Sequence, residues 1–177
     1  LAELVARLGP ATIVVNNSGV TATRSALDLE TGEWDKIMDT NLKGAWLVAR
    51  AAARHLIEAK QPGSIINIAS ILGFRVAGHV SAYTASKAAL VQLTRALALE
   101  WARYKIRVNA IAPGYVETDL NREFFASDVG KALIARIPQR RLGQIEDLDG
   151  PLLLLASDAS AYMTGAVIPV DGGEAEK

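Results

Sequence analysis

The 177-residue sequence contains no cysteine, which excludes disulfide bonds, thiolate catalysis and cysteine metal sites. It has only two histidines, so a histidine-rich metal centre is not expected, and we predict no metal site. The 19 basic and 19 acidic residues cancel, which leaves no bulk attraction to nucleic acid or to an anionic membrane. The apolar run at residues 151–156 is far too short to span a bilayer. We therefore expect neither nucleic acid nor a membrane as a partner.

What the sequence does contain is typical of one globular domain. Half of its residues are apolar, and 177 residues are enough to bury a sizeable core. Short apolar runs rich in β-branched residues alternate with longer segments of helical periodicity. We predict strands at residues 12–15, 64–69, 106–111 and 166–170, and helical segments at 34–59, 81–103 and 146–156. This alternation predicts an α/β fold of three layers (α/β/α), with a parallel sheet between helices.

Two segments carry further expectations. Residues 34–59 are expected to form two helices or one bent helix, with Gly44 near the bend. Residues 118–143 have mixed charge and no clear periodicity, which favours a mobile flap. Phe124 and Phe125 within it either cover an apolar substrate or fold the flap onto the body.

The most informative residues are Tyr83 and Lys87, four positions apart in the predicted helix at 81–103. This spacing places both side chains on one helical face, where the ammonium group is expected to lower the phenol pKa from about 10 toward neutral pH. Ser70 follows a predicted strand, and from there its hydroxyl can hold a substrate carbonyl or alcohol oxygen. Such an arrangement suits a proton transfer coupled to hydride transfer.

Chance explains the tyrosine–lysine pair more readily than the whole set. With four tyrosines and seven lysines in 177 residues, the pair has a chance probability of about 0.16. Requiring one of the nine serines thirteen positions before the tyrosine lowers it to about 0.01. The alternative interpretation makes Tyr83 and Lys87 a solvated pair, Ser70 a strand cap and Asn41 a helix cap.

A family resemblance rests on five motifs. In chain order they are Asn16-Asn17-Ser18-Gly19, Asn41, Ser70, Tyr83-Thr84-Ala85-Ser86-Lys87 and Pro113-Gly114-Tyr115-Val116-Glu117-Thr118. Their order and spacing resemble those of the short-chain dehydrogenase/reductase family over residues 1–173, most closely its 3-oxoacyl-(acyl-carrier-protein) reductase-like members. The resemblance implies a Rossmann-type fold and a reversible reduction of a ketone to a secondary alcohol, with NADP or NAD as cofactor.

The same resemblance implies a role for each site residue. Tyr83 is the general acid and base, Ser70 hydrogen-bonds the substrate oxygen, and Asn41 anchors a water that leads protons toward the lysine. Lys87 binds the nicotinamide ribose, Val116 the carboxamide through its backbone, and Thr118 lies beside the diphosphate. The implied catalytic residues are Asn41, Ser70, Tyr83 and Lys87, and the implied cofactor-binding residues are Asn17, Ser18, Gly19, Tyr83, Lys87, Pro113, Gly114, Val116 and Thr118.

The glycine-rich phosphate-binding turn of this family is absent. Neither G-x-x-x-G-x-G nor G-x-G-x-x-G occurs in the sequence, and its first strand corresponds to the family's fourth. Because the chain also begins at Leu1 rather than methionine, we expect residues 1–177 to be the C-terminal majority of a single Rossmann-type oxidoreductase domain, truncated at its N-terminal half. The residues that select NAD or NADP are then missing.

Two substrate classes remain open. A 3-oxoacyl thioester, on carrier protein or coenzyme A, is the preferred substrate, and a sugar acid or polyol, as in gluconate 5-dehydrogenase, is the alternative. A third possibility from another class is a non-catalytic, dimer-forming remnant. Arg140 and Arg141 could meet an anionic substrate group, although a short basic pair is usually solvated.

Two alanine-rich helical segments predict self-association. Residues 45–59 and 82–103 carry more alanine and leucine than one sheet face can bury. The resemblance implies that these helices pair with their copies in a homodimer, usually doubled into a homotetramer, in a cytoplasmic protein.

Overall fold

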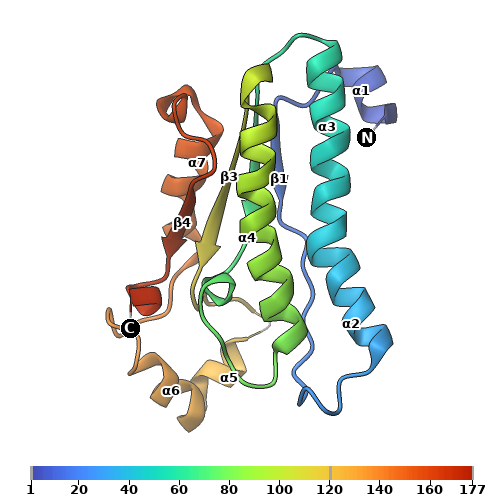
Figure 1. Cartoon of the computed structure of the whole chain (residues 1–177). Helices are drawn as coiled ribbons and strands as arrows, with labels where there is room; N and C mark the ends of the chain where they lie inside the picture. The colour runs from blue at the N-terminus through green and yellow to red at the C-terminus, as the bar shows by residue number, and fades with distance from the viewer. Residues whose placement is uncertain (1, 120, 177) are drawn as a thin grey trace.

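The predicted strands form one parallel sheet. In this computed structural model, which describes residues 2–119 and 121–176, the strand order is β1-β2-β3-β4 (Figure 1). The strands are β1 (Ile13–Asn16), β2 (Gly63–Ile68), β3 (Ile106–Pro113) and β4 (Val167–Val170). Each strand end lies within two residues of its predicted position, so the strand predictions are confirmed.

The helices also follow the predicted segments. The α-helices are α1 (Ala2–Leu8), α2 (Thr31–Met38), α3 (Ala45–Glu58), α4 (Ser81–Trp101), α5 (Arg122–Ala126), α6 (Asp128–Ile134) and α7 (Asp149–Ala156). Short 3-10 helices span Ile71–Gly73, Ala102–Tyr104, Ile145–Leu148, Asp158–Ser160 and Glu174–Glu176. The expected α/β/α arrangement is therefore present in the described residues.

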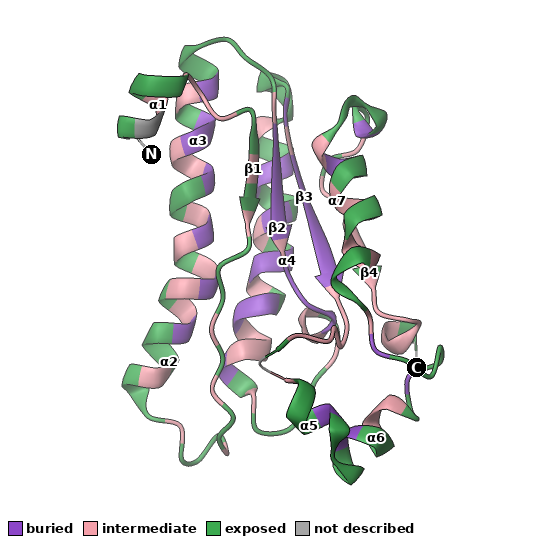
Figure 2. Ribbon diagram, turned by 180° about the vertical axis from the view of Figure 1, so that it is seen from behind, coloured by how far each residue is buried: buried purple, intermediate pink, exposed green. Residues whose placement is uncertain are grey.

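Alternating side chains of the strands bury two apolar layers, one on each face of the sheet. On one face, Ile65 of β2 and Val108 of β3 pack with Ala53 of α3 and Leu97 of α4. On the opposite face, neighbouring strand residues pack against Leu155 of α7. Figure 1 shows α3 and α4 in front of the sheet, and Figure 2 shows the buried strands β2 and β3 from behind, beside α7. Because successive strand residues point to opposite faces, continuous apolar runs suit a sheet covered on both sides.

The predicted bend between α2 and α3 is a π-helical turn. Residues Asp39–Gly44 form this turn, so α2 and α3 continue into each other without a loop. Gly44 lies at its end, and a Cβ atom added there would come within 3.3 Å of the Asp39 carbonyl oxygen. π-helical turns inside α-helices occur frequently at functional sites.

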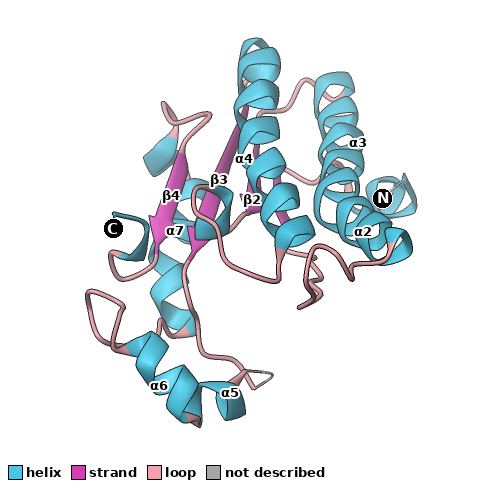
Figure 3. Ribbon diagram, turned by 60° about the horizontal axis from the view of Figure 1, so that its bottom comes forward, coloured by secondary structure: helices cyan, strands magenta, loops and turns pink. Residues whose placement is uncertain are grey.

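The segment predicted as a flap contains α5 and α6. Phe125 is buried there with Ile137 and Leu142, and its ring contacts Phe124 and Tyr115 edge to face. Phe124 is 49% exposed, so one phenylalanine anchors the segment while the other faces outward. In Figure 3, α5 and α6 lie beyond the carboxyl ends of the strands. The weak periodicity reflects two short helices that share a small apolar cluster.

Strand β1 is the least covered strand of the sheet. Ile13 and Val15 are 51% and 42% exposed, whereas Ile65 and Ile66 of β2 are fully buried. Within the described residues, no helix is long and apolar enough to cross a membrane.

Candidate active site

The predicted site residues gather at the carboxyl edge of the sheet. Residues 17–19 follow β1, Ser70 follows β2, and the 113–118 motif begins at the last residue of β3. Since all four strands are parallel, these strand ends lie on the same edge. In open α/β sheets this edge is where ligands bind. Figure 3, turned from Figure 1 so that the bottom comes forward, brings this edge into view.

Ser70 is fixed at the first turn after β2. Its backbone is extended, and its Oγ accepts a hydrogen bond of 3.1 Å from the Leu72 N–H, which caps the 3-10 helix Ile71–Gly73. The residue is buried. A small hydroxyl residue at this position therefore serves the local turn and also faces the neighbouring helix α4.

Tyr83 and Lys87 occupy the first turns of α4, as their spacing predicts. Lys87 Nζ lies 5.6 Å from the centre of the Tyr83 ring. The ammonium group also donates a 2.7 Å hydrogen bond to the Ile68 carbonyl oxygen at the end of β2. Only 4% of Lys87 is exposed, so this bond holds an amine that is almost removed from water.

The predicted effect of Lys87 on the tyrosine is wrong for this structure. Burial raises the pKa of Tyr83, while its hydrogen bond with Ser70 acts in the opposite direction. Burial also lowers the pKa of Lys87 to about 8. Both changes share one physical cause, because a low-dielectric environment disfavours the phenolate and the ammonium alike. Ser70, rather than Lys87, is the group that lowers the tyrosine pKa here.

Asn41 joins three segments of the site. Its Oδ1 accepts a 2.8 Å bond from the Val20 N–H, and its Nδ2 donates to the Val20 carbonyl oxygen at 2.9 Å. The same Nδ2 lies 3.0 Å from Ser86 Oγ, which in turn donates to the Tyr83 carbonyl oxygen at 2.7 Å. Asn41 is 1% exposed. Its side chain therefore links the π-helical turn to the segment after β1 and to α4. These bonds are not those of a simple helix cap, which was the alternative interpretation of Asn41.

The segment after β1 passes close to these side chains. A Cβ atom added to Gly19 would lie 3.5 Å from Asn41 Oδ1 and 3.6 Å from Lys87 Nζ. The backbone of Gly19 therefore runs beside Asn41 and Lys87, at a separation where an added Cβ atom would make ordinary van der Waals contact with both side chains. Asn17 and Ser18 are exposed at the strand end.

The motif after β3 is held by contacts that the sequence did not indicate. Val116 forms an isolated parallel bridge with Gly143. The Asn121 side chain donates to the Val116 carbonyl oxygen at 2.9 Å and accepts from the Thr118 N–H at 2.8 Å. Asn121 was not among the site residues predicted from the sequence. Its position three residues after Thr118, within reach of the Thr118 N–H, was the one available signal.

The two residues that open this motif pack against the end of β4. A Cβ atom added to Gly114 would lie 2.7 Å from the Asp171 Cβ, so only glycine fits without movement. Pro113 is the last residue of β3 and pairs with Val170.

Comparison with known proteins decides the family. A family model described as enoyl-(acyl carrier protein) reductase matches residues 1–174. The chain belongs to the short-chain dehydrogenase/reductase family. The predicted family and fold class are thereby confirmed.

Relatives of this short-chain dehydrogenase/reductase include enzymes of both predicted substrate classes. It is 44% identical over 172 residues to a 2-dehydro-3-deoxy-D-gluconate 5-dehydrogenase of Dickeya dadantii, covering 97% of this chain and 68% of the relative. It is 40% identical over 173 residues to a 3-oxoacyl-(acyl-carrier-protein) reductase of Pseudomonas aeruginosa, covering 98% and 69%. A solved gluconate 5-dehydrogenase of Burkholderia cenocepacia, in complex with NADP and tartrate, is 37% identical with a TM-score of 0.94, covering 99% and 69%.

A cavity of about 280 Å³ adjoins the Ser70 turn of this short-chain dehydrogenase/reductase. Its lining includes Arg75 and Arg136, neither of which the sequence singled out. The basic pair that the sequence did single out lies elsewhere. Arg141 forms a two-point ion pair with Asp147, at 2.6 and 3.1 Å, and Arg140 is exposed. Arg75 and Arg136 are 61 positions apart, so only the fold brings them to one cavity.

Proposed function

We propose that this protein interconverts a ketone and a secondary alcohol with NAD or NADP as hydride carrier. The observation that carries the proposal is the meeting of Ser70, Tyr83 and Lys87 at the carboxyl edge of a parallel sheet, beside the bare backbone of Gly19. A solvated tyrosine–lysine pair is a poorer account, because Lys87 is buried and bonded to Ile68.

In this proposal Tyr83 moves the proton. During reduction its phenol donates to the substrate carbonyl oxygen, and during oxidation its phenolate accepts the alcohol proton. Ser70 holds the same substrate oxygen by a hydrogen bond and stabilises the negative charge that develops there. The bound nicotinamide supplies or accepts the hydride.

Lys87 and Asn41 support that proton transfer. A lysine with a pKa of about 8 exchanges protons near neutral pH, so Lys87 can return a proton to the tyrosine. Asn41 holds the π-helical turn against Val20 and Ser86, and through Ser86 it steadies the first turn of α4. In our proposal a water bound at Asn41 connects Lys87 to solvent.

The residues of the carboxyl edge fit a nicotinamide cofactor. Because Gly19 has no side chain, a ribose held by Lys87 would meet only backbone on this side. We assign the cofactor contacts to the two strand-end motifs: Asn17, Ser18 and Gly19 after β1, Pro113, Gly114, Val116 and Thr118 after β3, with Tyr83 and Lys87 between them.

Two substrate classes suit the proposed reaction. A sugar acid or related hydroxy acid is supported by the relatives of 42–44% identity, which are 2-dehydro-3-deoxy-D-gluconate 5-dehydrogenases. A 3-oxoacyl thioester is the second candidate. It is supported by the apolar side of the cavity, where Ile71, Leu72 and Leu133 could contact an acyl chain.

The reaction is tested with a panel of keto acids, hydroxy acids, polyols and 3-oxoacyl thioesters, each with NAD(H) and NADP(H), on the full-length protein. We expect metal-independent turnover, unchanged by a chelator, of at least one class. Ser70→Ala is expected to lower kcat about a hundredfold, because it removes a hydrogen bond to developing charge. Ser25→Ala, which removes only a local hydrogen bond to the Leu27 N–H in the loop before α2, is the control. Turnover of no panel member, or equal kcat in the two variants, would contradict the proposed function.

Self-association is proposed through the outer faces of α3 and α4. A shallow apolar depression there is lined by Trp46 from α3 and by Ala89, Leu93 and Ala96 from α4. Small alanines allow two helices to approach closely, and one such face on each copy suits a two-fold symmetric dimer.

Ala96→Glu tests this assembly, since Ala96 is exposed in the single chain. A buried, unpaired carboxylate at the interface is expected to dissociate the oligomer of the full-length protein to monomer, as measured by light scattering. Ala126→Glu, exposed at the end of α5 and on neither α3 nor α4, is the comparison. A wild-type protein that is monomeric and active would refute the assembly.

A further inference from the structure

We infer that Arg75 and Arg136 form a carboxylate-binding subsite, so that the substrate is a hydroxy acid or keto acid rather than a neutral alcohol or thioester. This inference rests on the proposed function, because it assigns the substrate of the same site. It chooses between the two classes that the proposed reaction leaves open.

The cavity lies directly beside the proposed reaction centre. It is lined by Ile71 and Leu72, which follow Ser70 directly, and by Tyr115 from the motif after β3. Ser70 and Tyr83 do not line the cavity themselves, but it begins at the residue after Ser70, so we expect a molecule whose reacting oxygen lies at Ser70 and Tyr83 to extend into it with its remaining atoms. The volume of about 280 Å³ is enough for a small organic acid but small for a long acyl chain.

The lining of the cavity carries more positive than negative side chains. The lining contains two arginines, Arg75 and the exposed Arg136, and one carboxylate, Glu174. Within residues 2–119 and 121–176, Arg136 makes no ion pair. Burial and Glu174 raise the pKa of Tyr115, whereas Arg136 and Arg75 lower it, and all four residues line this cavity. The cavity therefore has an excess of positive charge next to apolar walls.

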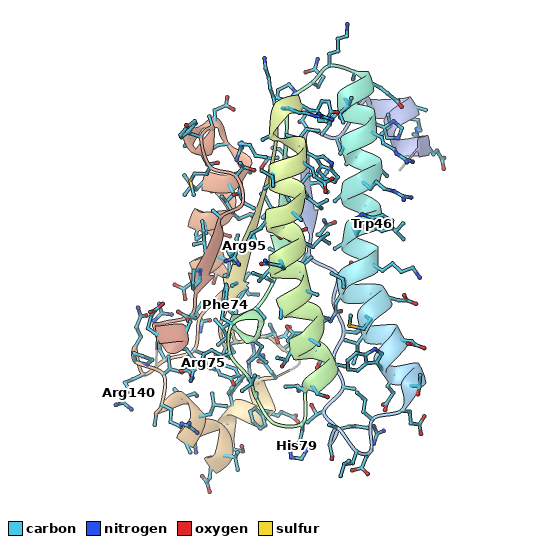
Figure 4. All side chains as sticks on the ribbon, viewed as in Figure 1. Trp46, Phe74, Arg75, His79, Arg95 and Arg140 are labelled. Atoms are coloured by element: carbon cyan, nitrogen blue, oxygen red, sulfur yellow. The ribbon has the colours of Figure 1, made fainter. Side chains whose placement is uncertain are left out.

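Glu174 shows how a carboxylate binds there. Arg75 donates to the Glu174 backbone carbonyl oxygen, and its guanidinium lies 3.6 Å from the Glu174 carboxylate. In Figure 4, Arg75 lies between the segment after β2 and the C-terminal turn, while Arg140 lies at the margin of the molecule. A substrate carboxylate would share Arg75 with Glu174 and recruit Arg136. Glu174 is thus an internal competitor for the subsite.

The chemistry of the pair favours an acid over a neutral ligand. A guanidinium group presents a planar fork of donors that matches the two oxygens of a carboxylate, and such charged bonds are the strong ones. A neutral alcohol or thioester would fill the cavity without neutralising the second arginine. Selectivity for the acid follows from its added attraction to the two guanidinium groups, since Arg136 is exposed and stays hydrated when a neutral ligand binds.

The test compares two pairs of probes that differ only in charge: D-gluconate with D-gluconamide, and acetoacetate with acetoacetamide. Binding to the full-length protein with saturating cofactor is measured by calorimetry, and turnover by NAD(P)H absorbance. We expect at least one acid to bind more tightly than its amide, and Arg75→Gln to weaken that acid about tenfold to a hundredfold while leaving the amide unchanged. Arg136→Gln is expected to act in the same direction.

Two further variants are measured: one is expected to tighten acid binding, and the other is a control. Glu174→Gln removes the internal competitor, so it should tighten acid binding severalfold, opposite in direction to Arg75→Gln. Arg140→Gln removes an exposed arginine outside the cavity and should change neither acid nor amide binding.

Each outcome separates this inference from the proposed function. Equal affinity of acid and amide, no binding of either acid, or a neutral N-acetylcysteamine 3-oxoacyl thioester turned over equally by wild type and Arg75→Gln would overturn the carboxylate subsite. The proposed reaction survives those results if any panel substrate is turned over and Ser70→Ala is impaired. Charge-selective binding without turnover of any substrate would keep the subsite and refute the proposed reaction.

Discussion

Replacing Tyr83 by phenylalanine is expected to lower kcat by about a hundredfold to ten-thousandfold, the usual contribution of a positioned general acid or base. The ring is retained, so α4 and its contacts should be undisturbed, and only the transferable proton is lost. Because that proton matters most in the transition state, kcat should fall far more than cofactor affinity. Steady-state kinetics and cofactor titration on the full-length protein measure the two quantities separately.

The matched control for this substitution is Tyr162→Phe. Tyr162 is fully exposed, so loss of its hydroxyl should leave kcat unchanged. If Tyr83→Phe turns over at a near-wild-type rate, Tyr83 is not the proton donor. A parallel loss of cofactor affinity would instead indicate that the phenol acts mainly in binding.

Lys87→Met is expected to have the second largest effect, lowering kcat/KM about a hundredfold or more, because the proton return and the ribose contact are lost together. The same variant should change how stability depends on pH. Burial lowers the pKa of Lys87 to about 8, whereas the unfolded chain keeps a lysine near its ordinary value of 10.5. Methionine has a similar length and no proton to exchange.

Whether native stability rises or falls with pH depends on which state, folded or unfolded, binds more protons. Below about pH 8 both states hold the Lys87 proton, and the native state carries the full cost of a buried charge. Between about pH 8 and 10.5 the native state releases its proton first, so the unfolded state binds more protons and native stability rises with pH. Wild type should therefore gain about 1–3 kcal/mol of unfolding free energy relative to Lys87→Met across this window.

Urea unfolding of wild type and variant without cofactor, at a series of pH values, measures this difference. Lys36→Met provides the control, since Lys36 is exposed on α2. A difference between wild type and Lys87→Met that stays flat from pH 8 to 10.5 would contradict the burial of the amine.

The layers of the fold were predictable because they depend on local pattern. Apolar, β-branched runs define β2 and β3, and the alanine-rich segment with helical periodicity defines α4, whose ends match the prediction closely. The spacing of Ser70, Tyr83 and Lys87 predicted their convergence for the same reason, since parallel strands share a carboxyl edge and a helix repeats every few residues.

What the sequence did not predict depends on the environment of each side chain. The pKa of Tyr83 is raised, opposite to expectation, because burial outweighs the hydrogen bond with Ser70, and burial is a property of the whole packed structure. Arg75 and Arg136 lie far apart in sequence and carry no local motif, so their shared cavity emerges only in three dimensions. Asn121 was missed because its role is to bond a backbone rather than a ligand.

The π-helical turn at Asp39–Gly44 makes this part of the chain sensitive to length as well as to composition. A π-helical turn arises from one extra residue within an α-helix. Losing a single residue would restore α-helical geometry and rotate α2 by about 100° relative to α3. Asn41 would then leave the two bonds that hold Val20, and the segment after β1 would lose its place beside Lys87. Among diverging copies of this chain, we therefore expect Asn41 to be retained and the turn to accept replacement at other positions more readily than insertion or deletion.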